Sequence, residues 1–390
     1  MRREAAHPGR IIVISDRVEH LADIPDGWSA DEPTVDDRSA AVVVEGGYLE
    51  RLPLSLIAAG RFAEAEVWHH GSGIDRPIAR RCSPHLVRRV FPLGEHTAPF
   101  DNRAMAEHLA RHGAPALLLI YGLGVSPAVL DAADRSIIVY NSIDAPALRV
   151  PEEVSARCDI VLTGAQWQSD EVNRRHPEMP TPILPVGPEF AGTDQFRPLS
   201  GEKDYDLIYA AAAQPYKRHD ILFDTVERLD GAVSALCVFG YGELAEAFRD
   251  EIAARQLPID CVMPPVVPFA EVNRLMNRAR IGIVAGVDDG APAIITEYML
   301  AGLPVLANAQ LTCGLQYLLP GTGEVADPAQ WPAAVTRMLQ QLDHYRPREI
   351  ALSRLSWPVS AARFLSIYDD AVAARHALGR APITLEDCDA

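Results

Sequence analysis

The sequence lacks the features that define membrane and secreted proteins. No apolar run approaches the ~18 residues that a membrane-spanning helix needs. The run IIVIS that follows the charged N-terminus is too short for the core of a signal peptide. No pair of cysteines has CxxC spacing, and the six are Cys82, Cys158, Cys237, Cys261, Cys313 and Cys388. We therefore expect reduced thiols in a cytoplasmic protein without a transmembrane segment.

Positive charge is also scarce. The chain has 36 Lys and Arg against 53 Asp and Glu, for a formal net charge of −17. A protein that binds nucleic acid is more often basic, because it must neutralise phosphates, so we expect no nucleic-acid partner. The acidity is compatible with a neutral or cationic substrate, although such a balance more often serves solubility alone.

The signature motifs of several enzyme classes are missing as well. There is no HExxH and no clustered His/Cys set, so we expect no metal ion. Neither a GxSxG nucleophile elbow nor a GxxxxGK[ST] phosphate loop occurs. The DYD triplet at 204–206 precedes a predicted strand and is interpreted as solvated surface. His69 and His70 end another strand, where a His pair is more often structural.

Short apolar runs alternate with helical segments along the chain. This alternation predicts parallel α/β sheets covered on both faces by helices. We predict strands at 10–15, 65–70, 116–121, 136–142, 158–164, 205–212, 235–240, 259–264, 280–286 and 303–308. We predict helices at 48–62, 102–113, 218–229, 243–256, 269–279, 292–301 and 356–379.

A stretch rich in proline and glycine, 176–204, interrupts this alternation. A chain of 390 residues is also long for one core. We therefore predict an N-terminal Rossmann-like domain at 1–195 and a C-terminal one at 196–355, with parallel sheets facing across a cleft. A final helix at 356–380 carries an apolar stripe that must pack against one of the two domains, before a tail at 381–390.

Glycines mark two turns where a strand leads into a helix. Gly46 and Gly47 occupy the first, in VVVEGGYLER, and Gly240 and Gly242 the second, in VFGYGELAE. Ligands of open α/β sheets bind beyond the carboxyl ends of the strands. Glycine there lets backbone amides approach an anion. Each signal alone is weak, and a tight turn without a ligand is the alternative.

The stretch DDGAPAIITEYMLAGLPVLAN, 288–308, places an acid in an otherwise apolar helix. A buried carboxylate needs a partner, so Glu297 meets solvent, a basic residue or a ligand. Asp289 precedes it by eight residues, about two helical turns, which predicts that both acids share one helix face. Such a pair suits a ligand with two hydroxylated parts. The alternative is that Asp289 caps the helix and Glu297 pairs with a basic side chain.

This stretch resembles the donor-site signature of family-4 retaining glycosyltransferases with the GT-B fold. That signature has an acid, a Gly and a short turn, followed by Glu-Ala-Met-Ala-x-Gly-x-Pro-Val. The similarity continues in EGGYLERLPLSLIAAG, IIVYNSIDAPAL, RCDIVLTGAQWQSDEVNRRHP, ILPVGPEFAGTDQFRPL, YDLIYAAAAQPYKRHDILFDTVERL and LSWPVSAARFLSIYDDAV. The resemblance implies transfer of a hexose-like unit from a nucleoside diphosphate sugar to an acceptor hydroxyl, without a metal or another cofactor. It also implies that the final helix crosses back to the N-terminal domain, whereas packing on the C-terminal domain alone is the alternative.

The resemblance also implies a role for each candidate residue of the C-terminal domain. Glu297 would bind the ribose hydroxyls and Asp289 the sugar ring. Lys217 would neutralise the departing diphosphate. The donor sugar and its phosphates would be framed by backbone amides of the turn Gly290, Ala291 and Pro292, although Pro292 itself has no N–H.

Further roles fall on the other loops. Gly240 and Gly242 would lie under the nucleoside, and Gly46 and Gly47 would bring amides to the diphosphate. Asp144, after IIVYN, would face the acceptor.

The sequence departs from the family at four places. Asp289 replaces the usual Glu, and Val186-Gly187 replaces the usual Asn-Gly of the linker. Ala212 stands where an Arg is usual, so half of the family's basic clamp on the diphosphate is missing. Arg218 stands directly after Lys217 where Gly is usual, and it is the candidate to compensate in part. These differences allow a specialised transferase or a catalytically weak relative that only binds nucleotide-sugar. A Rossmann oxidoreductase would need a third Gly in GYGELA, and a phosphorylase would need a lysine motif that is missing. The sugar, the base, the acceptor and the oligomeric state stay open.

Overall fold

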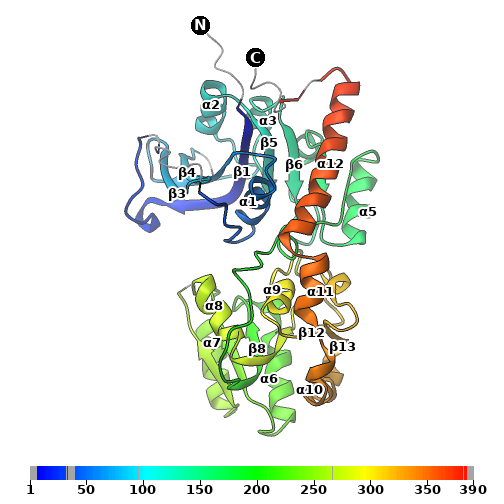
Figure 1. Ribbon diagram of the computed structural model, residues 1–390. Helices are drawn as coiled ribbons and strands as arrows, with labels where there is room; N and C mark the ends of the chain where they lie inside the picture. The colour runs from blue at the N-terminus through cyan, green and yellow to red at the C-terminus, as the bar shows by residue number, and fades with distance from the viewer. Residues whose placement is uncertain are drawn as a thin grey trace. The chain divides into compact units, whose positions relative to one another are not determined.

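The computed structural model describes residues 7–31, 33, 40–94, 96–265, 267–380 and 382–383. The chain divides into two compact units (Figure 1), one of residues 1–186 with 360–390 and one of residues 187–359. The first border thus falls at 186/187 where we predicted 195/196, and the second at 359/360 where we predicted 355/356. Cys388 and nearly all of the predicted tail lie outside the described residues.

The N-terminal unit is built on a seven-stranded sheet in the order β3-β4-β2-β1-β5-β6-β7. The strands are β1 (His7–His20), β2 (Glu64–Ser72), β3 (Ile78–Ser83), β4 (Leu86–Pro92), β5 (Pro115–Tyr121), β6 (Ile137–Asn141) and β7 (Ile160–Leu162). β3 runs antiparallel to β4, and every other pair is parallel.

The sheet is thus parallel, as predicted, except at this edge. β3 and β4 are joined by a short turn, which an antiparallel pair allows and a parallel pair does not. Arginines in both strands break up the apolar run by which a buried strand is recognised in a sequence.

The first four helices of this unit connect its strands, and they are α1 (Arg51–Ala58), α2 (Arg103–His112), α3 (Pro127–Asp131) and α4 (Glu152–Ser155). α5 (Gln166–Arg175) follows the last strand of the sheet, and most of α12 (Trp357–Ala377) also belongs to this unit. α12, drawn in orange to red in Figure 1, contributes its buried Phe364 and Tyr368 to this unit. The Tyr368 ring meets Phe62 edge-on at 5.5 Å, and Arg61 pairs with Asp369 at 2.5 Å.

The C-terminal unit has a six-stranded sheet in the order β10-β9-β8-β11-β12-β13, and all its pairs are parallel. The strands are β8 (Tyr205–Ala210), β9 (Ala235–Val238), β10 (Ile259–Val262), β11 (Ala279–Val284), β12 (Val305–Asn308) and β13 (Gly323–Ala326). The helices are α6 (His219–Arg228), α7 (Ala245–Ala254), α8 (Phe269–Met276), α9 (Ile294–Leu300), α10 (Trp331–Gln340) and α11 (Pro347–Arg354).

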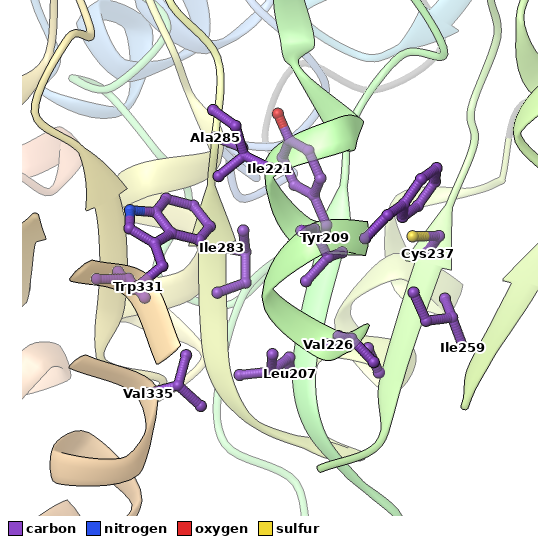
Figure 2. Close-up of a cluster of buried hydrophobic side chains, with 14 of the residues drawn as sticks. Leu207, Tyr209, Ile221, Val226, Cys237, Ile259, Ile283, Ala285, Trp331 and Val335 are labelled. Carbon is purple, nitrogen blue, oxygen red and sulfur yellow. The ribbon is translucent and has the colours of Figure 1, made fainter. Parts of the chain in front are cut away.

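Apolar side chains fill both faces of this second sheet, as continuous apolar strands require. On one face, Leu207, Ile283 and Cys237 from three strands meet Ile221 and Val226 of α6 (Figure 2). The cluster also includes Trp331, at the start of α10. Its ring is fully buried and its Nε1–H donates to the Ala326 carbonyl oxygen at 3.1 Å. A rigid base therefore supports the loops that follow β8 and β11.

Replacing this tryptophan tests how much that core depends on it. We expect Trp331→Ala to lower the free energy of unfolding of the C-terminal unit by about 3–5 kcal/mol, because the change leaves a cavity in addition to the lost burial. Leu352→Ala is the control, since Leu352 is 38% exposed in the same unit, and its effect should stay within ~0.5 kcal/mol. Urea unfolding followed by circular dichroism measures both. A loss below 1 kcal/mol for Trp331→Ala would contradict this account of the core.

Candidate functional site

The order of the strands selects one place on the C-terminal sheet. β8 pairs with β9 on one side and with β11 on the other, so the connections that leave β8 and β11 turn to opposite sides. In open α/β sheets, the crevice at such a switch point, beyond the carboxyl ends of the strands, is where ligands bind. The loop after β8 carries Lys217 and the loop after β11 carries Asp289.

The structure brings these two side chains together in an ion pair between Lys217 Nζ and Asp289 Oδ2. Both are mostly enclosed, with side-chain exposures of 17% and 14%. Backbone contacts fix the two loops to each other, since the Val287 N–H donates to the Tyr216 carbonyl oxygen at 3.0 Å. The Tyr209 hydroxyl donates to the Lys217 carbonyl oxygen at 2.5 Å. The position of the ion pair is therefore set by main-chain geometry.

The charge of Lys217 depends on this partner. Burial alone disfavours the charged ammonium, but the Asp289 carboxylate outweighs it, so that the pKa of Lys217 lies above its ordinary value. Lys217 is one of only two lysines in the chain, the other being Lys203, whereas every other basic side chain of the 36 is Arg. Lysine offers a compact charge on a flexible stem, which arginine does not.

The loop that carries Asp289 is held from two further directions. A β-carbon added to Gly187 would lie 2.4 Å from the Ala291 carbonyl oxygen, so only glycine allows the linker to pass this close. A β-carbon on Gly314 would lie 2.7 Å from Pro292 Cγ. The segment 290–292, predicted to frame a donor, is thus a packed turn.

The structure corrects the predicted relation between the two acids. α9 begins at Ile294, so Asp289 lies in the preceding loop and does not share a helix face with Glu297. Pro292 disfavours a helical backbone at Ala291, the residue before it. Glu297 lies on α9 and is only 7% exposed. Its neighbour Tyr298 anchors the helix to β8, with its hydroxyl donating to the Ile208 carbonyl oxygen at 3.2 Å.

The glycine turn after β9 packs against the loop after β8. The Ala213 N–H donates to the Tyr241 carbonyl oxygen at 2.7 Å, and the Leu244 N–H donates to the Ala213 carbonyl oxygen at 3.1 Å. Gly242 has φ +115°, and a β-carbon there would lie 2.4 Å from the Ala213 carbonyl oxygen. A β-carbon on Gly240 would meet nothing within 4 Å. Gly240 therefore leaves open space beside this turn.

Two residues of the predicted diphosphate clamp are placed differently from Lys217. Arg218 adopts a left-handed backbone with φ +52°. Its guanidinium pairs with Asp220, at 2.7 Å between Nη2 and Oδ2. Ala212, where the family has an Arg, is buried at 6% exposure. The ammonium of Lys217 therefore lies against Asp289, whereas the guanidinium of Arg218 lies against Asp220.

The predicted glycine turn of the N-terminal unit is closed on its own helix. The Gly47 N–H donates to Glu50 Oε2 at 2.8 Å, and Glu50 is the residue directly before α1. Arg88 donates to the other oxygen of the same carboxylate. A β-carbon on Gly46 would lie 2.8 Å from Glu50 Cβ. We expected the Gly47 amide to donate to a diphosphate, but in this structure it donates to the Glu50 carboxylate.

Asp144 belongs to a small polar group at the carboxyl edge of the N-terminal sheet. Its carboxylate pairs with Arg149 at 3.1 Å, and its carbonyl oxygen accepts from Gln168 Nε2 at 2.7 Å. Asp16, which the sequence analysis did not single out, lies near it. The Asp16 carboxylate accepts from the Leu123 N–H at 3.3 Å, and burial raises the pKa of this carboxyl.

The strand pairing shows where Asp16 lies. β1 has β2 on one side and β5 on the other, and Asp16 lies on β1 just beyond Ile14, its last residue paired with β5. This is the switch point of the N-terminal sheet. A β-carbon on Gly122 would lie 1.9 Å from Asp16 Oδ2, so glycine there makes room for the acid. The signal in the sequence was an acid directly after the apolar run RIIVIS, followed much later by IYGLG. Neither segment indicates on its own that the two meet.

Among the described residues, no group of three or more His, Cys, Asp or Glu side chains is arranged to hold a metal ion. Within the same ranges no helix has the length and apolar character needed to cross a bilayer. His69 and His70 are buried, and burial lowers their pKa values to about 3 and about 4. Both imidazoles are therefore neutral near neutral pH.

Residues 192–350, which lie within the C-terminal unit, match the protein family described as glycosyl transferases group 1. No curated protein matches the sequence. The chain is similar in structure to sucrose-phosphate synthase from Thermosynechococcus elongatus. That similarity covers 94% of this chain and 99% of the other, with 17% sequence identity and a TM-score of 0.66.

Two further solved structures are similar over nearly their whole length. A trehalose-6-phosphate protein from E. coli, bound with UDP-2-fluoro glucose, has 11% identity and a TM-score of 0.62 over 92% of this chain and 98% of its own. HepE from Anabaena, in complex with UDP and glucose, has 13% identity and a TM-score of 0.62 over 93% and 99%. At such identities the similarity shows the fold, and it confirms the predicted GT-B class of two α/β domains.

A buried histidine lies directly after the Lys217–Arg218 pair in sequence. His219 is fully buried among aromatic rings, with Tyr209 at 4.6 Å and Phe248 at 4.8 Å between centroids. Neither ring nitrogen has a hydrogen-bond partner among the described residues. Burial, assisted by the charge of Lys217, lowers its pKa to about 3. His219 thus stays neutral in the folded protein over a pH range in which the unfolded chain binds a proton.

This difference predicts a loss of stability in acid. Because the folded pKa is depressed, the stabilising effect is complete above the unfolded pKa of ~6.5 and is lost as the pH falls toward 3, by up to ~1.4 kcal/mol per pH unit. We expect His219→Leu to remove that part of the acid sensitivity. The exposed His344, changed to Gln, is the control. Urea unfolding at pH 7, 6, 5 and 4 gives the slopes, and equal slopes in His219→Leu and the parent would refute the assignment.

Proposed function

We propose that this protein is a retaining glycosyltransferase that moves a hexose-like unit from a nucleoside diphosphate sugar to an acceptor hydroxyl, without a metal ion. The observation that carries the proposal is the enclosed Lys217–Asp289 ion pair at the switch point of β8 and β11. It lies in the unit that matches the group 1 glycosyl transferases. Two structural relatives are described with UDP or a UDP-sugar bound, which favours a UDP-sugar as the first donor to test.

The ion pair suits a donor that carries both negative charge and hydroxyl groups. A diphosphate would replace the Asp289 carboxylate as the partner of Lys217. The carboxylate so released would accept hydrogen bonds from hydroxyls of the sugar. As the bond to the anomeric carbon breaks, negative charge grows on the leaving diphosphate, and Lys217 would stabilise it at that point. The main contribution of the protein is then positioning and charge stabilisation.

The remaining roles follow the same assignment. Glu297, on α9 and 7% exposed, would accept hydrogen bonds from the two ribose hydroxyls. Gly240 leaves space beside the turn after β9, where the nucleoside would lie. Acceptor binding is assigned to the N-terminal unit, where Asp144 and Asp16 gather at the carboxyl edge of the sheet. Arg218 is left out of the clamp, because it pairs with Asp220.

A second candidate function is supported by one observation. Ala212 is buried where the family carries an Arg, so one charge of the usual diphosphate clamp is missing. A protein that lacks one of the two positive charges could bind a nucleotide-sugar but transfer its sugar slowly or not at all. Measuring donor binding and turnover separately distinguishes the two functions, because only an enzyme releases nucleoside diphosphate in the presence of an acceptor.

Lys217→Ala tests the proposed role of the ammonium. We expect turnover to fall about 10²–10³-fold, since a charge placed against the developing negative charge is lost. Lys203→Ala is a matched control, because Lys203 is the only other lysine and is exposed. Release of nucleoside diphosphate from a panel of donors measures both. Turnover of Lys217→Ala within twofold of the parent, or no donor accepted by the parent, would sink the assignment.

Glu297→Gln tests the ribose contact. The change keeps the size of the side chain and removes its charge, and a hydrogen bond to a charged group contributes roughly 1.5–3 kcal/mol. We expect donor affinity to fall by about one to two decades with the melting temperature nearly unchanged. Calorimetric titration of the donor measures this loss. An unchanged affinity would remove Glu297 from the site.

A further inference from the structure

A polar cavity lies on the N-terminal unit, at the amino ends of β6 and β7. Its volume is about 550 Å³, within the range of small-molecule sites. The lining includes four arginines and two aspartates, which are Arg135, Arg157, Arg375, Arg380, Asp134 and Asp159. In a chain with a net charge of −17 this surplus of guanidinium groups is unusual. Leu130 and Ile138 add apolar wall.

The end of α12 explains how two of the arginines come together. Gly379, at φ +70°, ends the helix, and its N–H donates to the His376 carbonyl oxygen at 3.0 Å. The Arg380 N–H donates to the Arg375 carbonyl oxygen at 2.9 Å. These two bonds form a Schellman motif, which brings the residue after the glycine close to the one five positions earlier. An apolar pair usually occupies those two positions, whereas here both are arginines.

The charges of the cavity are only partly balanced. Arg375 is fixed by both oxygens of Asp159, at 2.7 and 2.8 Å, and by the Asp134 carbonyl oxygen at 2.6 Å. Arg157 pairs with Asp131 at 2.5 Å and is half exposed. Arg380 has no ion-pair partner in the described ranges. Two guanidinium groups are thus held near a third that pairs with no carboxylate of the described residues, and like charges kept together favour a bound anion.

We propose that this cavity binds the phosphate group of a small phosphorylated molecule, at a site separate from the Lys217–Asp289 pair. Arg380 and Arg157 would contact the phosphate, because guanidinium groups match its oxygens in pairs. Arg375, whose guanidinium is held by Asp159, would form part of the cavity wall. The proposal does not rest on the glycosyltransferase function.

Calorimetric titration of inorganic phosphate and of ribose 5-phosphate tests the cavity. All proteins carry Lys217→Ala, so that an anion at the Lys217–Asp289 site does not contribute. The pocket variant adds Arg157→Gln and Arg380→Gln. The control variant adds Arg103→Gln and Arg111→Gln, which remove the same charge from the exposed face of α2 in the same unit. Arg380→Gln alone serves if the double change lowers the melting temperature.

We expect saturable binding of both phosphates, weakened at least tenfold in the pocket variant and less than twofold in the control. Unphosphorylated ribose should show no binding. Raising the salt concentration from 50 to 200 mM should weaken phosphate binding, because the contacts are ionic. Equal affinity in the pocket and control variants would overturn the proposal, and so would the absence of saturable phosphate binding.

Discussion

The parallel pairing of β8 with β11 is the constraint on which the candidate site depends. Parallel strands place their carboxyl ends at the same edge, so the loops that leave β8 and β11 must emerge side by side. One loop carries Lys217 and the other Asp289, separated by 72 positions in sequence. The core in Figure 2, with Trp331 and Ile283 against α6, keeps the strands in place. The ion pair is a consequence of this pairing rather than of any local motif.

Burying a charged pair is not a general way to stabilise a fold. Desolvation of both groups opposes the attraction between them. Apolar side chains of similar size in the same place often give the fold equal stability. A functional reason for the Lys217–Asp289 pair is therefore easier to defend than a structural one. The near absence of lysine elsewhere supports this view, because the chain otherwise uses arginine for its positive charges. A flexible ammonium can exchange one oxygen partner for another as a ligand enters.

The two sheets share one arrangement but use different residues. In each sheet, the first strand of the unit is central, and the later strands are added on both of its sides. An acid lies on this strand or in the loop that follows its neighbour. In the N-terminal unit this acid is Asp16, for which Gly122 makes room. The glycine turn of that unit is meanwhile occupied by Glu50, whose carboxylate takes the Gly47 amide. An anion that used this amide would have to displace Glu50.

The sequence by itself determined the α/β class, the two-domain organisation, nearly all the parallel strands, and the stretch that contains Asp289 and Glu297. These depend on local patterns, since apolar runs of strand length and the residues that end helices are visible over a few positions. Tertiary structure alone decided what the side chains meet. It paired Lys217 with Asp289, turned Arg218 toward Asp220, closed Gly47 on Glu50 and set Asp16 against Gly122. Such contacts depend on strand order and on where each helix begins, and these follow from packing between segments that lie far apart in the chain.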